Sequence, residues 1–153
     1  ARTATFTATS HKPGGEPENV LSGISRKIGE VTNAWISDGI RAGGETLTMT
    51  PKAPCRLHEL RTTFYSDFAY PIRVTMAPNR QKQQRDGVPA ELVKDYTVTF
   101  YKDGKVVRTI EVKDNHQRHN VLTFPETACD RVDFTFHTTN GHPDVWVYEV
   151  RAY

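Results

Sequence analysis

The sequence has little of several features that mark particular classes of protein. None of its apolar runs approaches the roughly 18 residues that a membrane-spanning helix needs. Its 20 basic and 18 acidic side chains nearly cancel, to a net charge of +2, so it lacks the basic excess of a general nucleic-acid binder. A nucleophile elbow, a glycine-rich phosphate loop and an HExxH zinc motif are also missing. We therefore expect no catalytic activity, no nucleic-acid partner and no transmembrane segment.

Cysteine is scarce, with only Cys55 and Cys129 in 153 residues. A chain of this length can bury a core without covalent staples, so we expect one domain over residues 1–153. A single disulfide fits an exported protein, and two buried free thiols are the other interpretation. Sequence spacing does not place the two Cα atoms, so both interpretations stay open. The start at Ala1 is taken to indicate a module cut from a larger protein.

What the sequence does contain is apolar and polar residues in alternation, the period of half-buried strands. Asp103-Gly104 between two alternating runs is typical of a tight hairpin, because glycine accepts a positive φ without steric cost. Helical spacing is absent from the alternating segments, so the sequence predicts an all-β, two-sheet jelly-roll sandwich. The expected strands are Thr3–Thr9, Glu45–Thr50, Pro54–Tyr65, Pro71–Met76, Tyr96–Phe100, Val106–Val112, Val121–Phe124, Val132–Phe136 and Val145–Tyr153.

Two stretches break this pattern. Asn19–Gly39 follows a cluster of prolines and glycines and has no clean period, which predicts an ordered, irregular loop, and a loop of that length is usually functional. We expect a few buried anchors among its apolar residues, which are Val20, Leu21, Ile24, Ile28, Val31, Trp35 and Ile36. Ala77–Ala90 is polar, basic and bounded by prolines, and is interpreted as a solvated surface excursion. Trp35 and Trp146 are both expected in the core.

The order of these features resembles the galactose-binding-like jelly roll of discoidin domains, coagulation-factor type C domains and bacterial carbohydrate-binding modules. The residues that carry the resemblance are Pro17, Asn19 and Gly23 in the first turn, Trp35 and Ser37, and the final strand Tyr148–Tyr153. The segment Asn33–Asp38 looks like that of modules appended to secreted bacterial FAD-dependent oxidoreductases and glycan-degrading enzymes. The resemblance implies a monomeric accessory module, secreted, periplasmic or on the bacterial cell surface. Its partner would be a carbohydrate or the catalytic domain of the parent enzyme.

The resemblance also implies a structural Ca²⁺ ion between the first loop and the last strand. Its ligand positions correspond to Ser22, Asn33 and Glu149. Ser22 stands where the family has an aspartate, and Ca²⁺ prefers carboxylate oxygens, so Glu30 or Asp38 would have to replace the missing carboxylate.

Sugar recognition asks for planar hydrogen-bonding groups beside an aromatic ring. The candidate ligand-binding residues in the loops are Arg26, Arg118 and His142 as donors, with Phe68 or Tyr70 as the ring. His116 and His119 are interpreted as solvated turn residues, since no third zinc ligand is near them in the sequence. The alternative function is a structural or interdomain-packing module that binds no small ligand.

Overall fold

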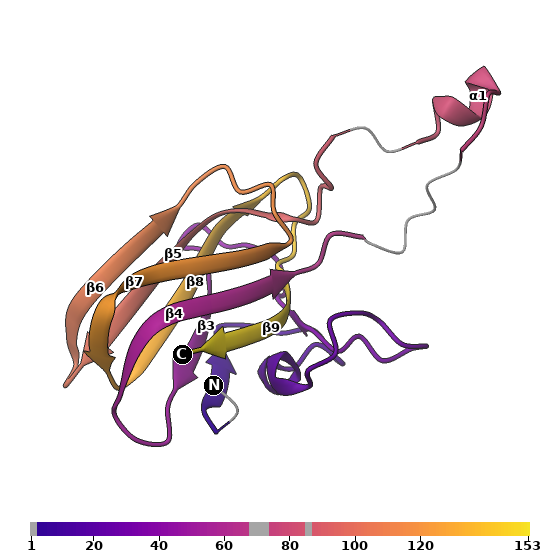
Figure 1. The fold of residues 1–153 in the computed structure, drawn as a ribbon. Coiled ribbons are helices and arrows are strands. Elements are labelled where there is room, and N and C mark those ends of the chain that lie inside the picture. The colour runs from indigo at the N-terminus through magenta and orange to yellow at the C-terminus, as the bar shows by residue number, and fades with distance from the viewer. Residues whose placement is uncertain (1–2, 68–73, 85–86) are drawn as a thin grey trace.

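The structure, a computed structural model, describes residues 3–67, 74–84 and 87–153. Its antiparallel strands form two sheets that pack face to face (Figure 1), which confirms the predicted all-β sandwich. The five-stranded sheet has the order β1 (Thr5–Ala8), β3 (Glu45–Thr50), β8 (Arg131–Thr139), β5 (Val93–Lys102) and β6 (Lys105–Val112). The four-stranded sheet has the order β2 (Trp35–Ile36), β9 (Trp146–Ala152), β4 (Cys55–Phe64) and β7 (His119–Cys129). Helices in the described ranges are limited to the 3-10 turn η1 (Pro17–Leu21) and α1 (Pro78–Gln81).

The core lies between the sheets and is made by the inward residues of each alternating strand. Tyr96, Val98 and Phe100 of β5 are buried together, as predicted. Trp35 is fully buried, which confirms its predicted place in the core. Its indole N–H donates to the Ser10 carbonyl at 3.0 Å, and its ring centroid lies 5.7 Å from that of Phe136. The buried indole therefore has its polar atom satisfied, and the first loop is anchored to the core.

The predicted tight hairpin between β5 and β6 is confirmed, with a turn of two residues between Lys102 and Lys105. Asp103 and Gly104 both have positive φ, at 51° and 74°. This is the conformation of the tight hairpin turn whose twist matches that of the flanking strands, and it explains the Asp-Gly pair.

Two sequence predictions of buried apolar residues are wrong. In the predicted strand Pro71–Met76, residues 71–73 lie outside the described residues, while Val74 and Met76 are exposed and in no strand. In the first loop the prediction of a few buried anchors is confirmed, because Val20, Trp35 and Ile36 are buried, while Ile24, Ile28 and Val31 are exposed. Alternation is a local signal, and it does not say whether a second layer exists to cover a given apolar side chain.

The second correction concerns Trp146, which lies half-buried on the outer face of the four-stranded sheet instead of in the core. The register between β4 and β9 shifts between Thr63 and Phe64, so that Tyr148 has no direct partner on β4. This bulge places Val147 and Val150 in the core and both Tyr148 and Trp146 outside it. A single inserted residue is enough to reverse the faces of a strand.

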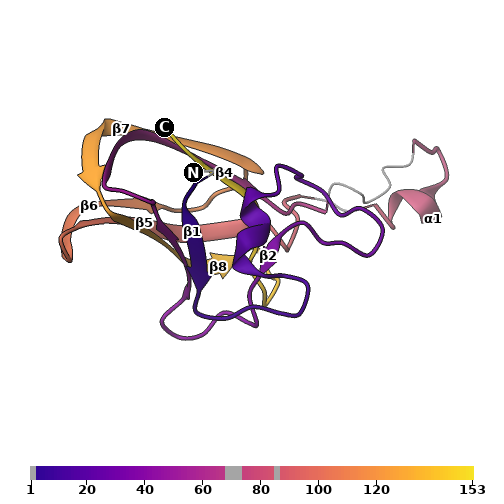
Figure 2. The ribbon, with the colours of Figure 1, turned by 90° about the horizontal axis from the view of Figure 1, so that it is seen from below.

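The strand registers place the long connections at one end of the sandwich and the short ones at the other. We call the first the loop end; its connections are 9–16, 22–34, 37–44, 65–92, 113–118 and 140–145. We call the second the turn end; it holds 51–54, 103–104 and residue 130. Figures 1 and 2 show the connection that carries α1 projecting from the loop end, away from the sheets. Within the described ranges, no helix has the length and apolar character needed to cross a bilayer.

Candidate functional site

One buried carboxylate holds three connections of the loop end together. Asp144 is buried, and its Oδ2 lies 2.5 Å from the Lys12 ammonium in the first connection. Its Oδ1 accepts a hydrogen bond from the Gly39 backbone N–H at 3.1 Å. A charged acceptor that joins loops in this way restricts their relative movement, because opening them would leave the carboxylate unpaired.

A second set of polar side chains, Asn115, Asn120 and Asn140, holds the connections 113–118 and 140–145. Asn115 donates to the Val93 carbonyl at 2.7 Å, and Asn120 donates to the Asn115 side-chain oxygen at 2.8 Å. Asn140 donates to the Leu92 carbonyl at 3.0 Å. These hydrogen bonds tie the connections 113–118 and 140–145 to residues 92 and 93, where β5 begins. The connections 113–118 and 140–145 are therefore held in place, and a surface that is already ordered loses little entropy on binding a ligand.

Three aromatic side chains, Tyr65, Trp146 and Tyr148, form a cluster on the outer face of the four-stranded sheet at this end. The Tyr65 ring centroid lies 4.6 Å from that of Trp146 and 5.9 Å from that of Tyr148. Tyr65 and Trp146 are half-buried, and Tyr148 is buried. Their proximity follows from the register, because Tyr65 extends β4 beside the first residues of β9. We call these three residues the aromatic cluster.

Electrostatics in the aromatic cluster favour neutral tyrosines. Burial, together with a 3.0 Å hydrogen bond from the Tyr65 hydroxyl to Asp67, raises the pKa of Tyr65 to about 12. Burial also raises the pKa of Tyr148. At neutral pH neither hydroxyl carries a negative charge, and the Tyr65 O–H is already used as a donor to Asp67.

Two of the predicted ligand-binding residues lie beside this cluster. The Arg118 guanidinium carbon lies 5.8 Å from the Tyr148 ring centroid, and its Nη2 donates to the Ser25 carbonyl. Arg26 is the next residue after Ser25 and is exposed. The structure thus brings the backbone that precedes Arg26 beside Arg118, from a connection that is far away in the sequence.

The other predicted ligand-binding residues lie elsewhere. His142 is also at the loop end, where its backbone N–H donates to the Ala90 carbonyl and its Nδ1 accepts from the Asp144 N–H at 3.1 Å. That imidazole nitrogen is therefore used within its own turn. Phe68 and Tyr70 lie outside the described residues.

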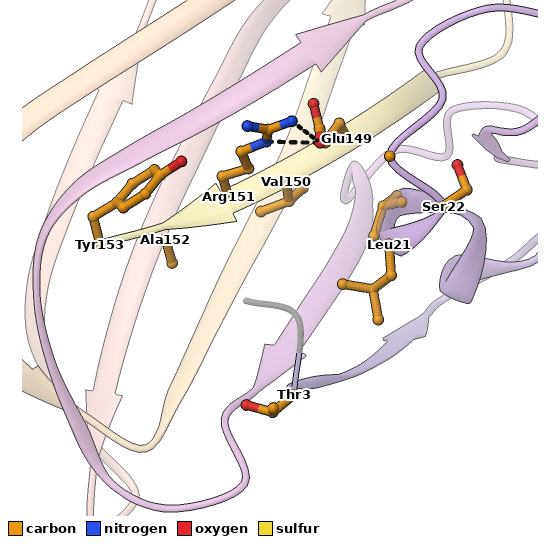
Figure 3. Close-up of a pocket in the computed structure, with 10 residues that line it drawn as sticks. Thr3, Leu21, Ser22, Glu149, Val150, Arg151, Ala152 and Tyr153 are labelled. Carbon is orange, nitrogen blue, oxygen red and sulfur yellow. Dashed lines mark hydrogen bonds and ion pairs between the residues drawn. The ribbon is translucent and has the colours of Figure 1, made fainter.

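A pocket of about 830 Å³ lies along β9, where the strand extends beyond its short pairing with β2. Figure 3 shows it between η1 on one side and β9 on the other. Two of the three predicted metal ligands, Ser22 and Glu149, line this pocket, and Asn33 is not among its lining residues. Asn33 instead donates its side-chain N–H to the Arg26 carbonyl at 3.1 Å, with a left-handed φ of 54°. Arg151, Tyr153 and Thr3 also line the pocket.

These residues do not make a calcium site in their present arrangement. Both Nε and Nη2 of Arg151 lie 2.7 Å from the Glu149 Oε1, so the carboxylate is already neutralised (Figure 3). Neither Glu30 nor Asp38 lines the pocket, and the described residues contain no group of three His, Cys, Asp or Glu that could hold a metal. Ca²⁺ normally takes six to eight oxygen ligands. Calcium binding therefore stays a prediction, and it would require Glu149 to leave Arg151.

Sequence reasoning did not identify the aromatic cluster. Trp146 and Tyr148 are two apart in a strand, which signals a shared face, but the sequence does not say which face is outside. Tyr65 follows a buried Phe64 and carries no mark that distinguishes it from a core residue. The register shift between β4 and β9 places Trp146 and Tyr148 on the outer face, and the end of β4 at Phe64 places Tyr65 beside them.

Comparison with known proteins finds similar structures but no family that shares the sequence. No family model and no curated protein matches the sequence. Among solved structures, the lectin domain of lectinolysin complexed with Lewis B antigen is similar with a TM-score of 0.72 at 10% identity, over 98% of this chain and 92% of that chain. A fucose-binding module of Streptococcus pneumoniae has a TM-score of 0.68 at 13% identity, over 97% and 89%. The family 32 carbohydrate-binding module from C. perfringens NanJ, in complex with galactose, has a TM-score of 0.65 at 13% identity, over 98% and 93%. The resemblance to galactose-binding-like jelly rolls is thus confirmed, and this chain has the β-sandwich fold of carbohydrate-binding modules.

Proposed function

We propose that this chain is a non-catalytic carbohydrate-binding module whose ligand binds at the loop end, against Arg118 and the aromatic cluster. The observation that carries the proposal is the position of the Arg118 guanidinium, held 5.8 Å from the Tyr148 ring beside the Tyr65–Trp146 pair. A planar donor next to ring faces is the arrangement that a sugar needs, with its hydroxyls on the guanidinium and its C–H face on a ring.

The rest of the site would come from the connections around it. Arg26 lies beside Ser25, whose carbonyl already accepts from Arg118, so its side chain can supply a second set of donors. The affinity should be weak, with a Kd on the order of 10 µM to 1 mM, because a shallow and wet site gains little beyond the cost of immobilising its ligand.

The wider setting of the proposal is an exported bacterial enzyme to which this chain is appended. The module would be a monomer that keeps the catalytic domain of its parent near a glycan. The fold of the similar structures supports this role, since they are sugar-binding modules by their own descriptions. Function from fold alone remains analogy, so the residues of the loop end must carry the test.

A second candidate function is packing against another protein domain. Val74 and Met76 in the connection that carries α1 are exposed by 103% and 93%, and Ile28 and Val31 at the tip of the first loop are also exposed. Apolar side chains that project from a domain in this way suit a protein partner. This function needs no sugar and makes the loop tips, instead of the aromatic cluster, the important surface.

A glycan array followed by calorimetry on the hits tests the proposal. Tyr65→Leu should abolish binding, because leucine keeps apolar volume but has neither a ring face nor a hydroxyl. Arg118→Met should do the same by removing the donors. Both variants should be compared by melting temperature to show that they stay folded.

The matched control is Tyr153→Leu, the same substitution at an exposed tyrosine that lines the pocket along β9. It should leave the affinity unchanged. Loss of binding in Tyr153→Leu with retention in Tyr65→Leu would move the site to that pocket. An array and calorimetry that are both blank at millimolar sugar would refute carbohydrate binding and favour the packing function.

A further inference from the structure

The two cysteines, which the sequence leaves unplaced, are direct neighbours in the fold. Cys55 is the first residue of β4 and Cys129 is the last residue of β7, and the two strands pair antiparallel with Cys55 opposite Cys129. Residues directly opposite in an antiparallel pair have Cα atoms about 4.5 to 5.5 Å apart. A disulfide spans Cα separations of about 4.4 to 6.8 Å, so bridging needs no movement of the strands.

The surroundings of the two thiols differ. Cys129 is buried at 1% exposure, while Cys55 is half-buried and packs against the edge of the core. Burial raises the pKa of the Cys129 thiol to about 12, and its neighbour Cys55 acts in the same direction. The more accessible Cys55 is therefore the thiol that an external oxidant meets first.

We propose that Cys55 and Cys129 form a reversible cross-strand disulfide when the chain meets a disulfide oxidant such as oxidised glutathione. The Cys55 thiolate attacks one sulfur of the oxidant, which forms a mixed disulfide and releases one reduced glutathione. The Cys129 thiol then loses its proton and attacks the Cys55 sulfur, which releases the second glutathione. Two protein thiols are oxidised and one glutathione disulfide is reduced, so electrons and protons balance.

The bond would stabilise the fold without altering the loop end. It would join strands whose residues are separated by nearly half the chain, and closing a long loop reduces the entropy of the unfolded state. Both cysteines lie at the turn end, beside Asp130, whose backbone N–H donates to the Tyr101 carbonyl. The connections that hold Arg118 and the aromatic cluster are at the other end of the same strands.

The test compares the reduced and oxidised forms of the unaltered chain. After incubation with oxidised glutathione, the intact mass should fall by two hydrogens, and both free thiols should be lost with the protein still monomeric. The melting temperature should rise by about 5 to 15 °C and return on reduction. Because Cys129 must deprotonate, closure of the mixed disulfide should become faster as the pH is raised from 7 to 9.

Cys55→Ser and Cys129→Ser serve as matched controls, since each keeps one thiol and neither can form the internal bond. Neither should gain thermal stability from the oxidant. A persistent glutathione adduct on the unaltered chain, a disulfide-linked dimer, or thiols that stay reduced would each overturn the proposal. So would an internal bond that leaves the melting temperature unchanged. None of these results depends on sugar binding, so failure here and failure of the proposed function are separate.

Discussion

Neutralising Asp144 tests whether the buried ion pair keeps the loop end rigid. Asp144 is well suited because it is the one described carboxylate that the Lys12 ammonium and the Gly39 N–H share. Asp144→Asn keeps the side-chain volume and an oxygen that can accept from Gly39. The substitution therefore removes the negative charge and replaces the oxygen that accepts from Lys12 with an amide NH₂ group.

The expected loss of unfolding free energy in Asp144→Asn lies between the loss from breaking an exposed ion pair and the loss from breaking a buried one. The side chain of Asp144 is 8% exposed, but that of Lys12 is 42% exposed, so solvent screens one partner. Exposed pairs contribute up to about 1 kcal/mol, and breaking a fully buried pair costs about 3 to 5 kcal/mol. We expect Asp144→Asn to lower the free energy of unfolding by about 1 to 3 kcal/mol. For a domain of this size that corresponds to a fall in melting temperature of roughly 3 to 10 °C.

Urea unfolding of four proteins measures the interaction itself. The four are the unaltered chain, Asp144→Asn, Lys12→Met and the double variant, and a double-mutant cycle gives the coupling energy. The coupling should be about 1 kcal/mol or more, and it should shrink at high salt because Lys12 is partly exposed. If the two single-variant changes in unfolding free energy add up to that of the double variant within about 0.4 kcal/mol, the reasoning is refuted, because two uncoupled residues cannot hold loops together.

Three further predictions follow from particular residues. Burial raises the pKa of Tyr96 to about 12, so its protonated phenol stabilises the fold fully below pH 10, and this stabilisation is lost as the pH rises to 12. The free energy of unfolding should fall by about 3 kcal/mol over that range. Tyr96→Phe should remove this pH dependence. If calcium binds, a chelator should lower the melting temperature of the unaltered chain, and Glu149→Gln should abolish that effect. A chelator that leaves the melting temperature of the unaltered chain unchanged would count against calcium binding. Gly104→Ala should cost about 1 kcal/mol in urea unfolding, because φ is 74° there, whereas full retention of stability would contradict the assigned turn.

The sequence by itself determined the features that depend on nearby residues. Alternation located most of the strands and gave the bounds of β3, from Glu45 to Thr50. The Asp-Gly pair determined the β5–β6 turn, because both residues of this tight turn need positive φ values and these two adopt them. Trp35 was placed correctly in the core, because it stands in a short apolar segment, Ala34 to Ile36, that is buried as a whole.

Only the tertiary structure decided which faces are covered and which distant residues meet. The bulge at Tyr148 moved Trp146 from the core to the outer face, and no local pattern marks a bulge. Arg118 reaches the Ser25 carbonyl, and Cys55 lies opposite Cys129, only because strand registers bring them together. Registers are set by packing over the whole sheet, and one residue of shift reverses every face. The candidate site is built from such long-range pairings, so the sequence could name Arg26 and Arg118 but could not join them to the aromatic cluster.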